Sequence, residues 1–167
     1  MSTRLRLTLP ALVLAVLFAV VGPAAAATAE ERPYVDQVDR MAAPAPSVGE
    51  RAARIALGAV GIPYHWGGES PASGFDCSGL VRWAYGRIGV ELPHSSYALY
   101  GEGRRVPRAR MKPGDVLFFE GLGHVGLYLG RGRMVHAPQS GRDVEVVRLS
   151  RSNYGRRLIG ARRVVPA

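Results

Sequence analysis

The sequence predicts an α+β fold, in which helices from the first half of the chain pack on an antiparallel sheet formed by the second half. Between residues 47 and 89, apolar residues recur at helical spacing in two segments. After Pro113 the pattern changes to short runs of Val, Leu, Phe and Tyr, broken by Gly and Pro at hairpin distances. Such runs are typical of antiparallel strands, and helices followed by strands are typical of an α+β domain.

The N-terminus has the composition of a secretory signal peptide. Arg4 and Arg6 precede an apolar run, Leu7 to Val21, and small residues follow up to Ala27, as in a cleavable leader. The run is shorter than the roughly 20 apolar residues of a membrane span. We therefore expect a signal peptide at 1–27 and export of the rest, with an uncleaved anchor as the alternative.

The remaining residues are expected to form a linker and one domain. Residues 28–46 mix charge, Ala and three prolines without apolar periodicity, which indicates a flexible linker. The domain is expected at 47–167. Ser47 with Glu50 three residues later is a capping box, and the helix it begins is expected to end at Gly61.

The next segment combines an irregular loop with a second helix. Residues 62–76 are rich in Gly, Pro and Ser, and irregular backbone held by a scaffold is where sites are commonly built. Asp76 can cap a helix that starts at Cys77 and ends at Gly89. A short third helix is expected near Ser95 or Ser96, and five strands are expected in the runs 115–120, 124–130, 133–138, 144–149 and 158–165.

Two of these strands carry histidines that the predicted hairpin brings together. A three-residue loop, "GRG", places Leu129 opposite Arg133. Because side chains alternate along a strand, His124 and His136 then share one face as diagonal neighbours. Gly126, between them, leaves room for the rings. A two-residue turn would instead place the histidines on opposite faces.

Cys77 is the only cysteine of the chain, so it has no partner for an internal disulfide. A lone cysteine is often a small core residue. In the first turn of a helix, however, a thiol pKa falls from about 8.5 to roughly 3.5–7.5. We interpret Cys77 as a nucleophile, His124 as its base and His136 as the residue that orients the ring of His124, the arrangement of acyl transfer through a thioester. The backbone N–H of Cys77 would stabilise the oxyanion.

Six segments together resemble the NlpC/P60 family of bacterial cell-wall peptidases: "PYHWGG", "DCSGLVRWAY", "LPHSS", "KPGDVLFF", "HVGLYLG" and "MVHAP". The resemblance covers about Val48 to Val165. It implies a papain-like α+β fold and hydrolysis of peptidoglycan stem peptides, typically between D-γ-glutamate and the following diamino acid, meso-diaminopimelate or lysine. It also implies that Cys77, His124 and His136 are the nucleophile, the base and the orienting residue.

The resemblance implies roles for three further residues. Tyr64 would lie beside the catalytic cysteine, and Asp76 and Ser78 would help to hold the amino end of the substrate. A helix cap is the structural alternative for Asp76, and both roles can coexist. His65 and His94 are expected to be loop residues near the cleft at most. Trp66 and Trp83 are expected to be packing side chains.

Composition limits the partners. The formal net charge is +9 and the pI about 10.6, which attracts polyanions. For an exported protein these are anionic wall polymers or lipid headgroups rather than nucleic acid, although a solvated basic surface is the simpler interpretation. We expect a monomer in the cell wall, without a cofactor. We also expect no metal, because one cysteine and two catalytic histidines make no ligand set.

Two other functions fit the same residues. The chain could be a non-catalytic wall-binding module, which the presence of Cys77, His124 and His136 argues against. It could also be an amidase or acyltransferase that uses the same triad on another amide or ester, because a fold and a triad do not determine the acyl group.

Overall fold

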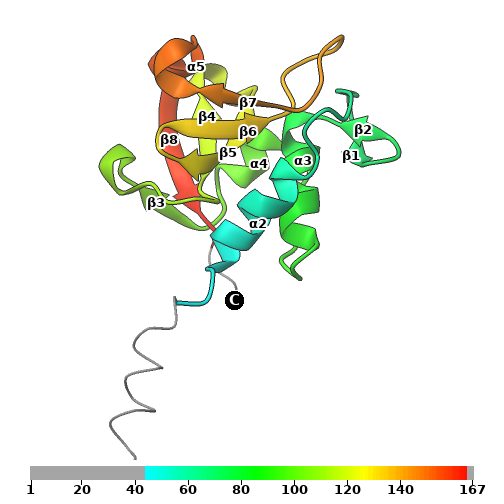
Figure 1. Cartoon of the computed structure of the whole chain (residues 1–167). Helices are drawn as coiled ribbons and strands as arrows, with labels where there is room; N and C mark the ends of the chain where they lie inside the picture. Colours follow the sequence, from blue (N-terminus) through cyan, green and yellow to red (C-terminus); the bar gives the residue numbers. More distant parts are fainter. Residues whose placement is uncertain (1–43, 165–167) are drawn as a thin grey trace, which may run out of the picture. The chain divides into compact units, whose positions relative to one another are not determined.

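The computed structural model describes residues 44–164. The predicted signal peptide at 1–27, most of the predicted linker and the last three residues lie outside this range. The described residues form a six-stranded antiparallel sheet in the order β3-β8-β4-β5-β6-β7, with helices against it (Figure 1). The predicted α+β class is therefore confirmed. Among the helices of this range, none has the length and apolar character needed to cross a membrane.

The sheet is a meander of four strands, and the last strand of the chain pairs with the first strand of this meander. Strands β4 to β7 pair in chain order, β8 returns to pair with β4, and the short β3 adds to the outer edge of β8. All five predicted strands are present, and β3 is an addition that the sequence analysis missed. The strands are β3 (Arg104–Val106), β4 (Val116–Phe119), β5 (Val125–Gly130), β6 (Arg133–His136), β7 (Glu145–Arg148) and β8 (Leu158–Arg163).

The three predicted helices begin where the sequence predicts, but the second ends at Gly86 rather than at the predicted Gly89, and a short fourth helix near the C-terminus was not predicted. The Ser47 capping box is formed, with the Glu50 N–H donating to Ser47 Oγ at 3.3 Å and the Ser47 N–H donating to Glu50 Oε2 at 2.7 Å. The first helix ends earlier than the predicted Gly61, because Gly58 caps it. The helices are α2 (Val48–Leu57), α3 (Cys77–Gly86), α4 (Ser96–Leu99) and α5 (Tyr154–Arg157).

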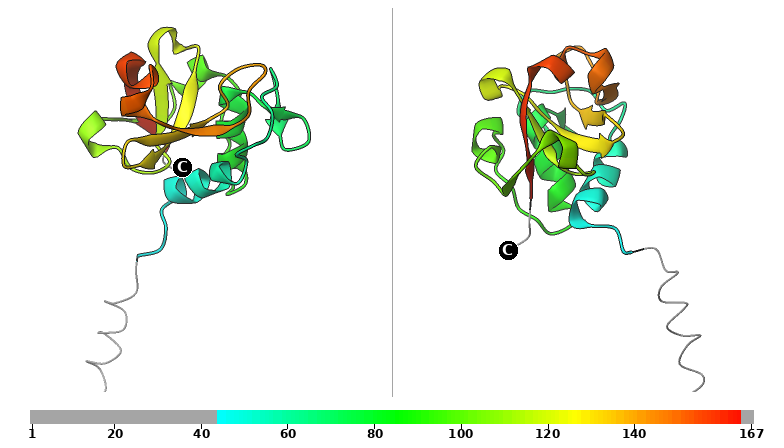
Figure 2. Two further views of the ribbon diagram at one scale, coloured as in Figure 1. Left: turned by 45° about the horizontal axis from the view of Figure 1, so that its top comes forward. Right: turned by 90° about the vertical axis from the view of Figure 1, so that its left-hand side faces the viewer.

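The sheet separates two apolar layers. On one face, α2 and α3 pack side by side (Figure 2) and bury Ala52, Ala56, Leu80 and Ala84 against the inward side chains of β4, β5 and β6. The opposite face is covered by the chain segment around Tyr154. Because successive side chains of a strand point to opposite faces of the sheet, each strand contributes alternate residues to the two layers.

The β5–β6 hairpin differs in detail from the prediction. The loop has two residues, Arg131 and Gly132, with φ angles of 52° and 68°. Two successive positive φ angles are typical of the type I′ turns that match the twist of paired strands. Gly130 therefore pairs with Arg133, and the predicted pairing of Leu129 with Arg133 is wrong.

A β-bulge compensates for the shorter loop. The register shifts between Tyr128 and Gly130, so that β5 carries one extra residue at this point. Tyr128 then pairs with Met134, as predicted. A two-residue turn without the bulge would have moved the histidines to opposite faces, whereas the bulge keeps His124 and His136 on the same face.

A small two-stranded sheet extends the loop that precedes α3. Its strands are β1 (Glu69–Ser70) and β2 (Gly74–Phe75). The beginning of this loop is tied to the connection between β6 and β7, because the Tyr64 N–H donates to the Arg142 carbonyl at 2.8 Å and the Val144 N–H donates to the Ile62 carbonyl at 2.8 Å. The loop that leads to Cys77 is thus attached to the connection that follows His136.

Candidate active site

Cys77 and His124 line one cavity, although they come from opposite halves of the chain. Cys77 is the first residue of α3, and His124 directly precedes β5. The backbone N–H of Val125, at the start of β5, is close enough to the Cys77 thiol to favour its anion. The cavity has a volume of about 580 Å³, and its lining includes Tyr64, Trp66, Asp76, Cys77, Ser78, His94, Tyr97, His124 and Pro138.

Asp76 holds the loop, the helix and His94 together. Its Oδ1 accepts hydrogen bonds from the Gly79 N–H at 2.7 Å and the Ser78 hydroxyl at 3.1 Å. Its Oδ2 accepts from the Gly67 N–H at 2.9 Å, and His94 Nε2 lies 3.0 Å from each oxygen. The helix cap expected for Asp76 is therefore formed. His94, expected to be a loop residue near the cleft at most, contacts the carboxylate next to Cys77.

Two glycines allow α3 to begin so close to the loop. A Cβ on Gly79 would lie 2.0 Å from the Gly68 carbonyl oxygen, and one on Gly68 would lie 2.5 Å from the Gly74 carbonyl oxygen. Real Cβ atoms do not approach backbone atoms so closely, so larger residues would push the helix away from the loop. Such an approach of two backbones is a structural use of glycine, and here it fixes the position of Cys77.

His124 and His136 meet as the hairpin geometry predicts. His124 Nε2 lies 2.9 Å from His136 Nδ1, and the two rings are nearly perpendicular, at 84°. His136 is fully buried, whereas His124 is partly exposed to the cavity. A Cβ on Gly126 would lie 3.1 Å from the Cβ of His136, so the glycine leaves the room that the two rings use. The Nδ1 of His124 remains for exchange of a proton with a reacting group.

Tyr154 contacts both histidine rings, a role that was not predicted from the sequence. Its ring stacks on His124 with a centroid distance of 5.3 Å and meets His136 edge-on at 4.7 Å. Phe119 packs against the rings of His124 and Tyr154. The rings are thereby held in place by packing from the face of the sheet that does not carry α2 and α3. Nothing in the pattern around Tyr154 marks it, because its position depends on the packing of α5.

Glu145 was also missed. It pairs with His136 across the β6–β7 ladder, and its Oε1 lies 3.3 Å from His136 Nε2. Directly opposite residues of an antiparallel pair place their side chains on the same face. The alternation within "VEVVRL" gives the face of Glu145, but its register against His136 depends on the long connection from residue 137 to residue 144.

The expected thiolate is not supported. Burial raises the pKa of the Cys77 thiol, and the negative charge of Asp76 adds to this, although backbone N–H groups of Val125, Ser78 and Cys77 itself favour the anion. Burial and the proximity of His136 lower the pKa of His124 to about 3. The helix N-terminus is therefore outweighed by desolvation. Both shifts favour a neutral thiol beside a neutral imidazole at neutral pH, contrary to the predicted ion pair.

Alkylation of Cys77 is expected to follow a raised thiol pKa. Because the thiolate reacts with iodoacetamide and the thiol does not, the alkylation rate should be low at pH 7 and should still be rising above pH 9. Mass spectrometry of samples quenched over a series of pH values measures this rate. A plateau reached below pH 8 would show that the thiolate forms readily in the folded protein, contrary to the effect of burial.

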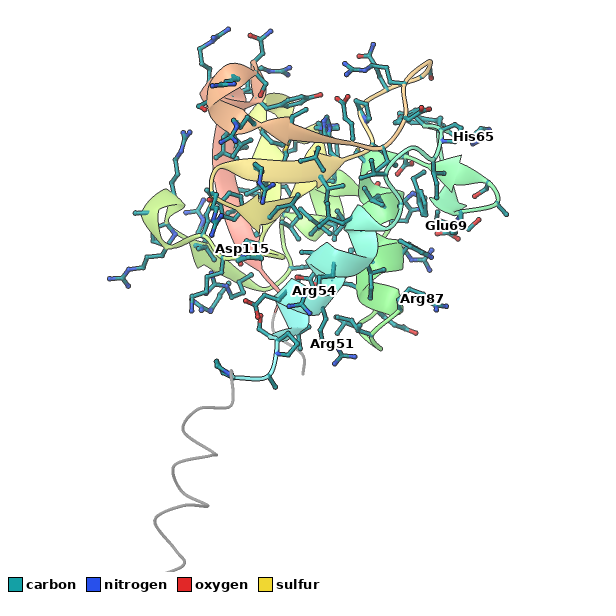
Figure 3. The ribbon with its side chains drawn as sticks, in the orientation of Figure 1. Arg51, Arg54, His65, Glu69, Arg87 and Asp115 are labelled. Carbon is teal, nitrogen blue, oxygen red and sulfur yellow. The ribbon has the colours of Figure 1, made fainter. Side chains whose placement is uncertain are left out.

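The other aromatic residues and His65 have different surroundings. Trp83 packs on Phe75 with ring centroids 5.0 Å apart, as expected. Trp66 does not pack: its residue is 82% exposed and lines the cavity beside Cys77. His65 is exposed near Glu69, on the side of the molecule that carries the small sheet (Figure 3). Within residues 44–164, no three His, Cys, Asp or Glu side chains are arranged so that they could hold a metal ion.

Comparison with known proteins gives consistent matches. The model of the NlpC/P60 family matches residues 61–163. A Mycobacterium tuberculosis protein named "Probable endopeptidase" is 49% identical over 107 residues, which are 62% of this chain and 28% of that protein. The murein DD-endopeptidase MepH of Escherichia coli is 38% identical over 114 residues, which are 64% of this chain and 42% of that protein. The chain thus spans less than half the length of these two relatives.

A solved structure matches the fold. The crystal structure of an NlpC/P60 family protein from Bacillus cereus superimposes with a TM-score of 0.66 at 33% sequence identity. The match covers 74% of this chain and 42% of that chain. The helices and the antiparallel sheet described above are therefore those of a known fold.

Proposed function

Because this chain belongs to the NlpC/P60 family, we propose that it is an exported cysteine endopeptidase that hydrolyses the stem peptides of peptidoglycan. One observation carries the proposal: Cys77 and His124 line the same cavity, and His136 contacts the far nitrogen of His124 at 2.9 Å. This is the set of groups that acyl transfer to a thiol requires. Both relatives are named as endopeptidases, one as a probable endopeptidase and one as a murein endopeptidase, which supports the same reaction class.

Because the Cys77 thiol and the His124 imidazole are both neutral before substrate binds, the thiol must lose its proton during the attack. As Cys77 Sγ bonds to the substrate carbonyl carbon, the thiol proton passes to Nδ1 of His124. The C–N bond then breaks, His124 protonates the leaving amine, and a thioester remains on Cys77. Water attacks the thioester carbonyl while His124 takes its proton, the C–S bond breaks to release the carboxylic acid, and the proton on His124 returns to the Cys77 thiolate. The backbone N–H of Cys77 stabilises the oxyanion in both steps.

The bond between D-γ-glutamate and the following diamino acid is the proposed target. Tyr64 lines the same cavity as Cys77, and burial raises the pKa of its hydroxyl. The two oxygens of Asp76 already have four partners within the chain. We therefore assign to Asp76 an electrostatic attraction for the substrate ammonium, and to Tyr64 and Ser78 the contacts with the amino end of the substrate.

The proposed location is the cell wall. It rests on the signal-like sequence at 1–27, which lies outside the described residues, and on the murein-acting relative. Removal of 1–27 takes Arg4 and Arg6 from the net charge of +9 and leaves a charge of +7, which favours retention by anionic wall polymers, and the chain is proposed to act as a monomer. Retention of this kind should weaken as salt screens the charges.

Digestion of purified sacculi tests the function. The protein is incubated with sacculi, and released fragments are identified by mass spectrometry, with Cys77→Ala as the control. We expect fragments cut between D-γ-glutamate and the diamino acid, and no such fragments from Cys77→Ala. The variant should still sediment with sacculi, because its basic surface is unchanged.

Each other outcome identifies a different function. Fragments cut within the D,D cross-link would assign the activity named for MepH. Intact stem peptides released from the glycan would indicate an amidase. Sedimentation with sacculi and no fragments under reducing conditions would indicate a wall-binding module and would overturn the proposal.

A further inference from the structure

The carboxylate of Glu145 lies next to His136, on the side of the ring away from His124. Its Oε1 lies 3.3 Å from His136 Nε2, and its Oε2 pairs with the exposed Arg142. The other nitrogen of His136, Nδ1, contacts His124 Nε2 at 2.9 Å. Glu145, His136 and His124 therefore form a continuous line that ends at the cavity containing Cys77.

The carboxylate decides which nitrogen of His136 carries the proton. His136 is fully buried, and within residues 44–164 its Nε2 has no hydrogen bond of ordinary geometry, so the acidic oxygen at 3.3 Å is the partner within reach. A lone pair on Nε2 would face a negative oxygen and be repelled, whereas an N–H would be attracted and could donate to it. The proton of the neutral ring is therefore placed on Nε2, and Nδ1 of His136 is an acceptor.

The tautomer of His136 determines that of His124. An acceptor at His136 Nδ1 requires a donor at the atom 2.9 Å away, which is Nε2 of His124. A neutral imidazole carries one N–H, so Nδ1 of His124 is then unprotonated. This is the form in which Nδ1 can accept a proton from the Cys77 thiol. The opposite arrangement would put a proton on Nδ1 and block that step.

We propose that Glu145 is a positioning residue that holds His136 and His124 in the tautomers in which Nδ1 of His124 can act as a base. The position of Glu145 is itself fixed by the fold. Glu145 pairs with His136 in the sheet, and the preceding residue, Val144, is tied by two backbone hydrogen bonds to Gly61 and Ile62. The kinetic consequence rests on the proposed function, whereas the assignment of tautomers does not.

Nitrogen NMR of ¹⁵N-histidine-labelled protein tests the assignment directly. At pH 7 both rings are neutral, because burial lowers the pKa of His136 to about 4 and that of His124 to about 3. We expect the wild-type rings of His124 and His136 to be Nε2–H tautomers. A proton on Nδ1 of His136 in the wild-type protein would overturn the proposal without any variant.

Two substitutions separate the carboxylate from its ion pair. In Glu145→Gln the amide can donate to His136 Nε2, so the Nδ1–H tautomer of His136 should become populated, and kcat on stem peptides should fall about 10- to 100-fold with little change in KM. Arg142→Gln removes the arginine on Oε2 and leaves the contact at Oε1. Its tautomers should match those of the wild type, and its kcat should stay within about threefold.

The two arms of the experiment fail independently. Wild-type tautomers retained in a folded Glu145→Gln protein, as judged by thermal melting and by the remaining histidine signals, would overturn the role of Glu145. An absence of any peptidoglycan hydrolysis by the wild-type protein would instead overturn the proposed function, and the NMR arm would still decide whether the carboxylate orients the rings.

Discussion

His124→Ala is expected to lower kcat/KM on stem peptides by about 10³- to 10⁴-fold, with a smaller change in KM. The reason is the neutral resting pair: burial raises the pKa of Cys77, so the sulfur becomes nucleophilic only as its proton leaves. His124 is the group at the cavity that can take this proton and later return it to the leaving amine. Loss of His124 therefore affects both acylation and release of the product. Initial rates on a soluble stem peptide measure the effect.

A double-mutant cycle shows whether His124 acts together with Cys77. Groups that act as one unit give non-additive losses, so Cys77→Ala, His124→Ala and the double variant should share the same residual rate. Multiplied losses would mean that His124 contributes independently of the thiol. If His124→Ala kept more than about a tenth of wild-type activity, another group would have to be the base.

The position of the site could be predicted from the sequence because its signals are local. The cap at Asp76 and the apolar face of the helix that follows are encoded within one short segment, and the alternation along β5 and β6 is encoded within another. The error in the β5–β6 loop had no effect on the histidines, because a bulge at Leu129 added back the residue that the shorter loop removed. Whether the two histidines share a face depends on how many residues between them are paired in the strands. The residue missing from the loop is present in the bulge, so this number is unchanged.

The missed features depend on contacts between distant segments. Glu145 reaches His136 through the register of β7, and Tyr154 reaches the histidines through the packing of α5. The edge strand β3 carries two arginines, and its place is set by pairing with β8. The predicted thiolate failed for a similar reason: the helix N-terminus is visible in the sequence, whereas the burial that outweighs it is a property of the assembled fold.

The stability of the fold depends on Asp115, a buried carboxylate. Figure 3 labels it on the side of the molecule away from the β1–β2 hairpin. Asp115 is 1% exposed. Its Oδ1 accepts from Arg163 Nε at 2.7 Å, and its Oδ2 accepts from Arg163 Nη2 and from the Lys112 N–H, both at 2.8 Å. Asp115 therefore connects the turn before β4 to the end of β8.

Asp115→Ala is expected to reduce the free energy of unfolding by about 2–4 kcal/mol, because it removes a two-pronged ion pair and leaves partly buried donors without acceptors. The lower part of the usual range for buried pairs is expected, since the Arg163 side chain is 23% exposed and can be rehydrated. The midpoint of thermal unfolding should fall by roughly 10 °C, as followed by circular dichroism.

Glu120→Ala is the matched control, because Glu120 follows the same strand, β4, that Asp115 precedes. Its ion pair with Arg157 is long, at 3.6 Å, and both side chains are more than half exposed. Solvent screening makes such a pair nearly neutral for stability, so the change should be under about 0.5 kcal/mol. Equal losses in the two variants would show that burial does not distinguish these carboxylates. A loss confined to Asp115→Ala would instead make its contact with Arg163 a principal restraint on β8, the strand that closes the sheet against β4.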